Sequence, residues 1–457
     1  MSTMRLTDDA IRAALTPAVD VRAPAGLADE IQAAIETTPQ RRRAILAWPA
    51  SRRLSLVLQL VLVGLLLLAL IGVLLFAGSH RPPVPGLVST YHGGPERTGV
   101  MPGPGPAGSP KREWEASVKG PIGAWSPAVV DGTVYTGDES GYVSAIAETT
   151  GVLRWQVDVG APINSGVSIV SGLLLAGDDN GAIHALDVTR QGAQVWTYQA
   201  GGPVHSSAAV VEDVAYFGSL DGHLYALDVA TGKLRWPAPI ATPGPISRAI
   251  AVANGVIYVG SGNGAGSGPG MLGAYDTKTG ALLWSVPLEP GNTSTPTIVD
   301  GRVFVAGGLD STTSTSHHLY AFDAATGRPA WAVPLAAPSG KAILLGAVTG
   351  GQVFAPSVDG LLYVVDASTG SLAWTRPIGA SLSPNAGFVA GVLYVTSDDR
   401  KVHAIDISTH AELWAFAVTG TPSAPAVIDG RIIVGTSLGK VVSIVGSGDP
   451  LGSATAP

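Results

Sequence analysis

The sequence predicts an all-β protein: an eight-bladed β-propeller, preceded by one transmembrane helix and a short helical segment at the N-terminus. Three observations lead to this prediction. Eight of the ten tryptophans recur 40 to 48 residues apart. Each interval contains four short apolar runs separated by turn residues. A stretch of 24 residues near the N-terminus carries no charge.

The N-terminal segment, residues 1–53, has the pattern of a small helical piece. Apolar residues fall at helical spacings over residues 8–15 and again over 27–35, and Pro24 and Gly26 break the chain between them. We expect two short helices there. They serve either as a tether or as a module that binds a cytoplasmic protein partner.

Residues 54–77 form the uncharged stretch, in which Ser55 and Gln59 are the only ordinary polar side chains. A helix of this length is about 36 Å long, enough to cross a hydrocarbon core of about 30 Å. A buried core helix and a cleavable signal peptide are the alternatives. The apolar part of a signal peptide is about 7–15 residues and follows a short basic start, so an uncleaved transmembrane helix is favoured.

The charges beside this stretch predict its orientation. Five arginines stand just before it and one stands close after it. The positive-inside rule keeps residues 1–53 in the cytoplasm and sends the remainder outside. We expect a single-pass protein of the cell membrane, with a Pro/Gly-rich linker over residues 78–90 and an extracytoplasmic propeller. The arginines are Arg41, Arg42, Arg43, Arg52 and Arg53, against Arg81.

The repeat predicts the blades. In its clearest unit, residues 206–236, Asp-Gly and Thr-Gly pairs separate the apolar runs, where hairpins need residues that accept positive φ. Four antiparallel strands cannot bury both faces of one sheet, and radial stacking of several such sheets does bury them. The tryptophans that would dock one blade on the next are Trp114, Trp155, Trp196, Trp236, Trp284, Trp331, Trp374 and Trp414.

The two ends of the repeat array complement each other. Trp114 lacks the three apolar runs that precede the other tryptophans, whereas residues 424–445 contain three runs and no tryptophan. We therefore expect a strand at 112–117 to pair with one at 440–445 and close the ring, leaving no free sheet edge. The propeller would span residues 91–446, and a disordered tail would follow over 447–457.

The end of each repeat carries a motif with a known parallel. The pattern Ala-x-Asp-x-x-Thr-Gly-x-x-x-Trp, which runs from Ala226 to Trp236, resembles the tryptophan docking motif of the PQQ-like β-propeller family. The segment from Tyr91 to Gly99 also looks like the start of that family. The resemblance covers residues 91–446 and implies an eight-bladed propeller. It is less specific for function, because one fold supports many functions.

Three relatives by resemblance suggest different functions. The lipoprotein subunit of the outer-membrane barrel-assembly machinery uses such a propeller for protein contact, but this chain lacks the cysteine that carries the lipid. The layout of residues 1–77 is similar to bacterial transmembrane anti-sigma factors, without their His/Cys metal motif. Quinoprotein dehydrogenases, the third relative, oxidise alcohols or sugars with PQQ and a bound Ca²⁺.

The dehydrogenase resemblance implies long loops, a catalytic aspartate, oxygen ligands for the ion and, in many members, a disulfide between adjacent cysteines. This chain has no cysteine and no clustered carboxylate motif. Its blades of about 45 residues leave little chain for active-site loops. We assign no catalytic, cofactor-binding or metal-binding residue and expect no cofactor; PQQ and Ca²⁺ belong only to the alternative.

The charge distribution argues against nucleic acid as a partner. The net charge is −7, with +2 on residues 1–53 and −9 on the rest, whereas nucleic-acid binders show a basic patch or stripe. Aspartates recur before the third strand of the repeats, where Asp-Gly turns are expected for backbone reasons. We interpret these as structural: Asp138, Asp178, Asp179, Asp221, Asp310, Asp359, Asp398 and Asp399.

Two groups of residues are candidates for binding. Adjacent repeats carry insertions at the same turn, which predicts a contact edge for a partner or ligand on one rim, although tolerated extensions are the alternative. Residues at the first strands of the repeats are predicted to line the central channel. The loop candidates are Asn263, Ser267, Met271, Asp310, Thr313 and His317, and the channel candidates are Trp125, Ser206, Arg248, Thr295 and Asn385.

The favoured function is that of a non-catalytic, membrane-anchored scaffold or sensor that binds a protein or a cell-surface polymer outside the cell membrane. A membrane-anchored PQQ-dependent alcohol or sugar dehydrogenase is the first alternative. An anti-sigma-like signalling protein with the propeller as its sensor is the second.

Overall fold

The computed structural model describes residues 89–262, 268–309, 317–335 and 344–448. Within these ranges no helix is both long and apolar enough to cross a membrane. The predicted N-terminal helices, the predicted transmembrane helix at 54–77 and most of the linker at 78–90 lie outside the described residues.

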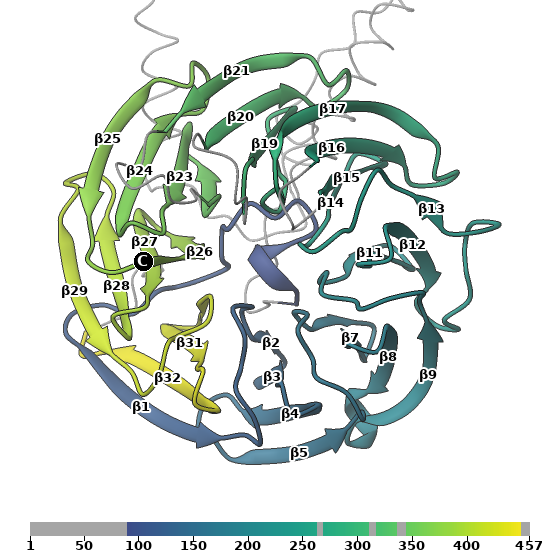
Figure 1. Ribbon diagram of the computed structural model, residues 1–457. Helices are drawn as coiled ribbons and strands as arrows, with labels where there is room; N and C mark the ends of the chain where they lie inside the picture. Colours follow the sequence, from purple (N-terminus) through teal and green to yellow (C-terminus); the bar gives the residue numbers. More distant parts are fainter. Residues whose placement is uncertain (1–88, 263–267, 310–316, 336–343, 449–457) are drawn as a thin grey trace, which may run out of the picture. The chain divides into compact units, whose positions relative to one another are not determined.

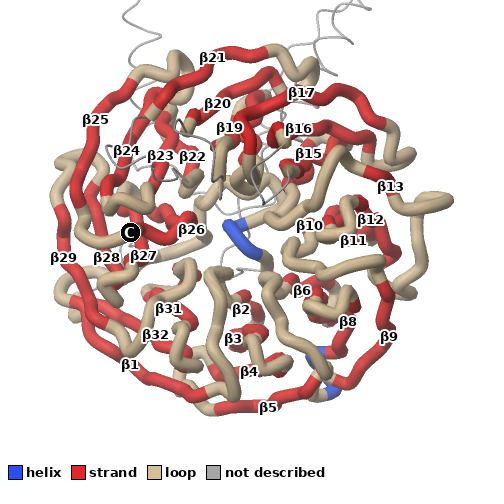
Figure 2. Tube along the Cα trace, in the orientation of Figure 1, coloured by secondary structure: helices blue, strands red, loops and turns tan. Residues whose placement is uncertain are grey.

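Eight four-stranded antiparallel sheets stand around a central axis like the blades of a propeller (Figure 1). The predicted all-β, eight-bladed fold is confirmed. The helical elements of the described residues are two short 3-10 helices, η1 (Tyr91–Gly93) and η2 (Val188–Arg190). η1 lies at the centre of the ring (Figure 2).

Blades 1 to 4 follow one another along the chain, each from its innermost to its outermost strand. Blade 1 contains β2 (Ala128–Val130), β3 (Thr133–Gly137), β4 (Tyr142–Ala147) and β5 (Leu153–Asp158). Blade 2 contains β6 (Ser168–Val170), β7 (Leu173–Gly177), β8 (Ala182–Asp187) and β9 (Ala193–Gln199). Blade 3 contains β10 (Ala209–Val211), β11 (Val214–Gly218), β12 (His223–Asp228) and β13 (Ile240–Ala241). Blade 4 contains β14 (Ala251–Ala253), β15 (Val256–Ser261), β16 (Pro269–Asp276) and β17 (Leu282–Pro290).

Blades 5 to 7 continue in the same order, and blade 8 combines the two ends of the propeller. Blade 5 contains β18 (Thr297–Val299), β19 (Arg302–Ala306), β20 (His318–Asp323) and β21 (Pro329–Pro334). Blade 6 contains β22 (Ala347–Thr349), β23 (Gln352–Pro356), β24 (Leu361–Asp366) and β25 (Leu372–Pro377). Blade 7 contains β26 (Leu382–Val389), β27 (Val392–Ser397), β28 (Lys401–Asp406) and β29 (Glu412–Ala417). Blade 8 contains β30 (Ala426–Ile428), β31 (Arg431–Gly435), β32 (Lys440–Gly446) and, outermost, β1 (Pro110–Ser117).

The ring closes between the first and last strands, as the sequence predicts. β1 pairs antiparallel with β32, from Pro110 opposite Gly446 to Ser117 opposite Lys440. Beyond β32, the N–H of Ser447 donates to the carbonyl oxygen of Ser109 at 3.0 Å. The closing pair therefore leaves neither β1 nor β32 as an unpaired edge on that side.

The core lies between neighbouring sheets. Val143 of β4 and Leu174 of β7 are completely buried in one cluster that blades 1 and 2 share. The outermost strands alternate exposed and half-buried residues, as in β25 and β29, because only one face of each can reach a neighbouring blade. Apolar residues on both faces of the inner three strands are thereby removed from water.

The tryptophans of the outer strands, and Trp236 just before β13, reach the following blade. The indole N–H of Trp284 donates to the carbonyl oxygen of Ala324 at 3.0 Å, and a Cβ on Gly327 would stand only 2.6 Å from the indole ring. Gly327 has a φ of +69°, so the turn and the ring approach each other closely only because the residue has no side chain. The same N–H bond to a backbone carbonyl occurs for Trp114, Trp196, Trp236 and Trp331.

Several of the recurrent aspartates stabilise turns; Asp310 lies outside the described residues. Asp138 Oδ1 accepts hydrogen bonds from the backbone N–H groups of Ser140 (2.9 Å) and Tyr142 (3.1 Å). Asp178 Oδ1 bonds the equivalent N–H groups of the next blade at 2.9 and 2.7 Å. These carboxylates satisfy backbone donors that the tight turn leaves without strand partners, which agrees with the structural interpretation.

Candidate functional site

The axis of the propeller is occupied by residues 89–104, which we call the axial segment. It passes the innermost strands in turn and bonds to their backbones. The carbonyl oxygens of Pro95 and Thr98 accept the N–H groups of Val252 and Val348, both at 2.9 Å. Short parallel bridges join Val100 to Phe388 and Gly103 to Ile428. The chain itself therefore fills the channel that the eight blades surround.

Arg97 fixes this segment in place. Its side chain is completely buried, and Nε donates to the carbonyl oxygen of Ile250 at 2.9 Å. The other nitrogens donate to Thr90 Oγ1 (2.7 Å) and to backbone carbonyl oxygens, among them Ala208 at 2.9 Å. Burial lowers the pKa of Arg97 to about 10. A buried guanidinium with so many acceptors cross-links blades 3 and 4 to the axial segment.

Tyr91 and His92 stack on each other beside Arg97, with ring centroids 4.7 Å apart. His92 has a φ of +62° and is buried, and its Nδ1 bonds the carbonyl oxygen of Arg97 at 3.1 Å. That oxygen can only accept, so Nδ1 carries the proton. Burial lowers the pKa of His92 to about 4. Burial also raises the pKa of Tyr91 well above its ordinary range, against the opposing effects of Arg248, Arg97 and a hydrogen bond with Thr295.

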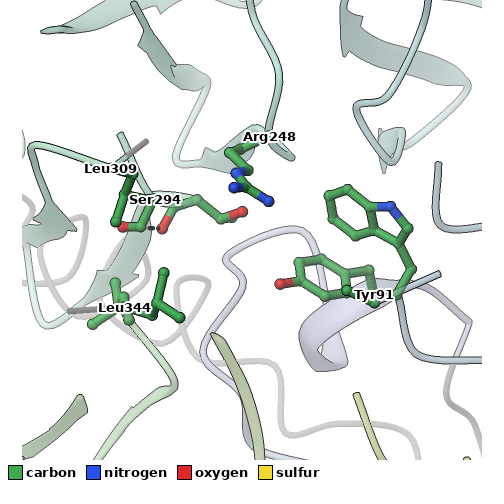
Figure 3. Close-up of a pocket in the computed structure, with 9 residues that line it drawn as sticks. Tyr91, Arg248, Ser294, Leu309 and Leu344 are labelled. Carbon is green, nitrogen blue, oxygen red and sulfur yellow. Dashed lines mark hydrogen bonds between the residues drawn. The ribbon is translucent and has the colours of Figure 1, made fainter. Parts of the chain in front are cut away.

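A small cavity of about 50 Å³ opens beside Tyr91. Figure 3 shows Arg248 extending between Tyr91 on one side and Leu309 and Leu344 on the other. Ser294 lies on the same side as the leucines and uses its hydroxyl locally, donating to the carbonyl oxygen of Thr295 at 3.3 Å. The full lining is Tyr91, Ala124, Trp125, Arg248, Ser294, Thr295, Leu309, Leu344 and Leu345.

The structure places only some of the predicted channel residues at the cavity. Trp125, Arg248 and Thr295 come from three different blades and line this one cavity. Ser206 is buried and is not part of the lining. Asn385 lies within β26, and its side chain is outside the described residues.

Trp125 is held by a chain of polar contacts. Its indole N–H donates to the carbonyl oxygen of Asn164 at 2.7 Å. The Asn164 amide donates to Asp179 Oδ2 at 2.9 Å, and Asp179 Oδ1 bonds His205 Nε2 at 2.9 Å. The indole also meets the ring of Tyr91 edge-on, at 4.7 Å between centroids. The wall that Trp125 contributes to the cavity is therefore fixed in orientation.

The family is decided by the repeat itself. The family model described as outer membrane protein assembly factor BamB matches residues 107–265, 244–381 and 315–455, which together span more than half of the chain. The chain belongs to this BamB family. The PQQ-like resemblance seen in the tryptophan motif is thereby confirmed. No curated protein matches the chain at a significant level.

Solved structures show the same fold at low identity. BamB from Moraxella catarrhalis has a TM-score of 0.59 at 20% identity, over 74% of this chain and 100% of that one. The quinohemoprotein alcohol dehydrogenase ADHIIG from Pseudomonas putida HK5 has a TM-score of 0.61 at 15% identity, over 81% of each chain. The computationally designed Ika8 protein has 0.62 at 15%, over 73% and 99%. At these identities the likeness concerns the fold alone, which a dehydrogenase, a BamB and a designed protein share.

PQQ with Ca²⁺, which the dehydrogenase alternative requires, does not fit the described residues of this BamB-family member. Sites for ligands of cofactor size occupy about 300–1,000 Å³, against about 50 Å³ here. Within the described ranges no group of three or more His, Cys, Asp or Glu side chains could hold a metal ion. No reaction step is assigned to these groups.

The predicted contact loops lie at equivalent turns of blades 4 and 5, between β15 and β16 and between β19 and β20. Asn263, Ser267, Asp310 and Thr313 are outside the described residues. Met271 lies within β16, opposite Ser261 of β15, and His317 is buried next to β20.

Sequence reasoning missed Tyr91, Leu309, Leu344 and Leu345 as cavity residues. The signal for Leu344 was present, because it stands at the same place before an inner strand as Trp125 and Arg248. Tyr91 had no such signal, since only the path of the axial segment brings it to the cavity.

Proposed function

We propose that this BamB-family protein is a non-catalytic, membrane-anchored propeller that binds a protein partner outside the cytoplasm. The observation that carries the proposal is the axial segment, which occupies most of the central channel of the propeller. The buried, fully bonded Arg97 makes this filling part of the fold. Apart from the small cavity beside Tyr91, binding then falls to the outer surface and the rims.

Family membership supports a protein partner. The family is described as an outer membrane protein assembly factor, and the BamB of Moraxella catarrhalis has the same fold. A cytoplasmic partner for residues 1–53 stays a prediction, because those residues lie outside the described ranges.

The absence of cysteine makes the proposed topology directly testable. One cysteine is placed at Leu438, which is 61% exposed, and in a second variant one is placed at Ser2. A membrane-impermeant maleimide applied to intact cells is expected to label the Leu438→Cys protein and to label Ser2→Cys only after permeabilisation. The reverse pattern, or equal labelling of both, contradicts the anchor and its orientation.

Partner binding is tested with a photo-crosslinking residue at single exposed positions around the perimeter: Leu153, Leu283, Leu372 and Leu413. These lie on the outer strands of blades 1, 4, 6 and 7. A specific partner is expected to crosslink from one sector and not from the others. Uniform or absent crosslinking, together with dye-linked oxidation of alcohols or sugars after addition of PQQ and Ca²⁺, would overturn the proposal in favour of the dehydrogenase.

A further inference from the structure

The repeat has a preferred residue three places before each inner strand. In four blades this residue is serine: Ser165, Ser206, Ser294 and Ser423. The hydroxyl has a local backbone function. Ser165 Oγ accepts the N–H of Gly177 at 2.9 Å, and Ser423 Oγ accepts the N–H of Gly435 at 2.9 Å. Serine at this place thus satisfies a backbone N–H group at the end of the second strand.

Three blades carry a larger side chain at this place, and these side chains meet; blade 7, whose inner strand β26 begins at Leu382, has a glycine three places before it. Trp125 precedes β2, Arg248 precedes β14 and Leu344 precedes β22. They belong to blades 1, 4 and 6, which are not neighbours, yet all three line the same cavity on the axis. Because serine is enough for the fold at this place, we attribute the three larger side chains to a function of the cavity.

The chemistry of the lining selects a ligand class. Arg248 brings a guanidinium, whose planar donors match a carboxylate. Tyr91 and Thr295 bring hydroxyl groups, while Leu344 and the fixed indole of Trp125 form apolar walls. A volume of about 50 Å³ accommodates about three to five water-sized groups at about 10–15 Å³ each.

We propose that this cavity binds a carboxylate carried on one or two carbon atoms. The carboxylate is either that of a free small carboxylic acid or that of an acidic side chain or C-terminus of a protein partner. The second source rests on the proposed function.

The test uses the full-length protein titrated calorimetrically with propionate at constant ionic strength, and with propionamide as the neutral analogue of the same shape. Propionate is expected to bind at least about 10-fold more tightly than propionamide, since hydrogen bonds to charged groups contribute more than neutral ones. Equal binding of the two, or no binding of either, overturns the proposal.

Variants that restore the repeat identify the site. Arg248→Ser is expected to fold, because serine occupies this place in four other blades, and to weaken propionate binding by about 10-fold or more. Arg328→Gln, a change at an exposed arginine of blade 5, is the matched control and should bind as the wild type does. Unchanged binding by a folded Arg248→Ser protein places the propionate elsewhere and refutes the assignment.

Short peptides with a free or an amidated C-terminus, and peptides with Asp or Asn at one position, separate the two sources. Tighter binding of an acid-bearing peptide than of propionate assigns the site to a partner, and the opposite order assigns it to a free acid. If no carboxylate binds while sector-specific crosslinks persist, this inference fails and the proposed function stands.

Discussion

The imidazole of His410 stacks on the indole of Trp374, with ring centroids 4.3 Å apart and an angle of 21° between the rings. His410 occupies the turn position that is glycine in the six other blades with this turn, and it keeps the positive φ of that position, +59°. At the junction between blades 6 and 7, the stacking of two rings therefore takes the place of the close contact between a glycine and an indole.

This exchange predicts an order of stability among variants at position 410. His410→Gly and His410→Ala both lose the stacking, but only alanine keeps the cost of a left-handed backbone with a Cβ, about 1–2 kcal/mol. We expect the His410→Ala protein to unfold at lower denaturant than His410→Gly by roughly that free energy. Equal midpoints would show that the backbone conformation at this turn carries no cost.

The ordinary junctions predict a second difference. Gly327 and Gly301 have similar φ values of +69° and +72°, but a Cβ on Gly327 would meet the ring of Trp284, whereas one on Gly301 would meet nothing within 4 Å. Alanine at either position costs about 1–2 kcal/mol for the backbone, and at Gly327 overpacking adds about 1–3 kcal/mol. Chemical denaturation should therefore rank Gly327→Ala clearly below Gly301→Ala. Matching free energies of unfolding would mean that the indole of Trp284 moves aside at no cost in free energy.

The hydrogen bonds of Arg97 are expected to stabilise the backbone at the axis. Its replacement by methionine leaves buried carbonyl oxygens, such as those of Ile250 and Ala208, without donors. We expect the amides of Val252 and Val348, which bond to the axial segment, to exchange roughly 100-fold faster, for a loss of about 3 kcal/mol. Hydrogen exchange read by mass spectrometry measures this.

Arg302→Met is the matched control for that experiment. Arg302 also donates to two backbone carbonyl oxygens, those of Ala367 and Ser368 at 2.6 and 2.9 Å, but it lies away from the axis on β19. Its loss should leave the exchange of the axial amides unchanged. If both variants accelerate that exchange equally, the effect is global and the axial role of Arg97 is refuted.

His92 predicts a pH dependence of stability. Burial lowers its pKa from 6.5 to about 4, so between pH 6.5 and 4 the unfolded chain binds the proton that the folded chain refuses. Stability is therefore expected to fall as the pH drops through this window, by about 3 kcal/mol from this group when it is complete. The His92→Asn variant should lose less stability across this pH window. Asparagine is chosen because it tolerates positive φ.

Denaturant midpoints at pH 7, 6, 5 and 4 give the slope for the wild type and the variant. The same substitution at His223, a half-exposed residue of β12, controls for the removal of a histidine as such. A His92→Asn protein with the wild-type acid slope would exclude His92 as its source.

The ring closure predicts a stabilising ion pair. Arg431 of β31 and Glu113 of β1 form two parallel hydrogen bonds, at 2.9 Å (Nε to Oε2) and 3.1 Å (Nη2 to Oε1). A bidentate guanidinium–carboxylate pair that is only partly exposed stabilises at the upper end of the range for surface pairs, about 1 kcal/mol. Glu113→Gln should lower the unfolding temperature, whereas Glu115→Gln, at the exposed pair with Arg112, should lower it less. If the two substitutions lower the unfolding temperature equally, the pair of Arg431 with Glu113 contributes no more stability than the pair of Arg112 with Glu115.

The sequence predicts the blades well because each blade repeats the same local signals. Tryptophan spacing, Asp-Gly turns and alternating strands all agree, and they place even the divided blade 8 correctly. The cavity is only half predictable. Trp125 and Arg248 depart visibly from the repeat, whereas Tyr91 reaches the axis through backbone bonds to distant inner strands that no local pattern encodes. His410 escaped prediction because a histidine at a turn carries no signal of stacking.

The pairing of β1 with β32 also has a consequence for the order of events during synthesis. β1 is the first strand of the propeller to be made, and its partner is the last, more than 300 residues later. Until residue 446 has been added, β1 has no sheet to join and blade 8 lacks its outer strand. Contacts over so long a stretch of chain form slowly. The newly made protein therefore carries an unmatched strand for as long as its synthesis lasts, and a chain truncated anywhere before β32 cannot complete the circle.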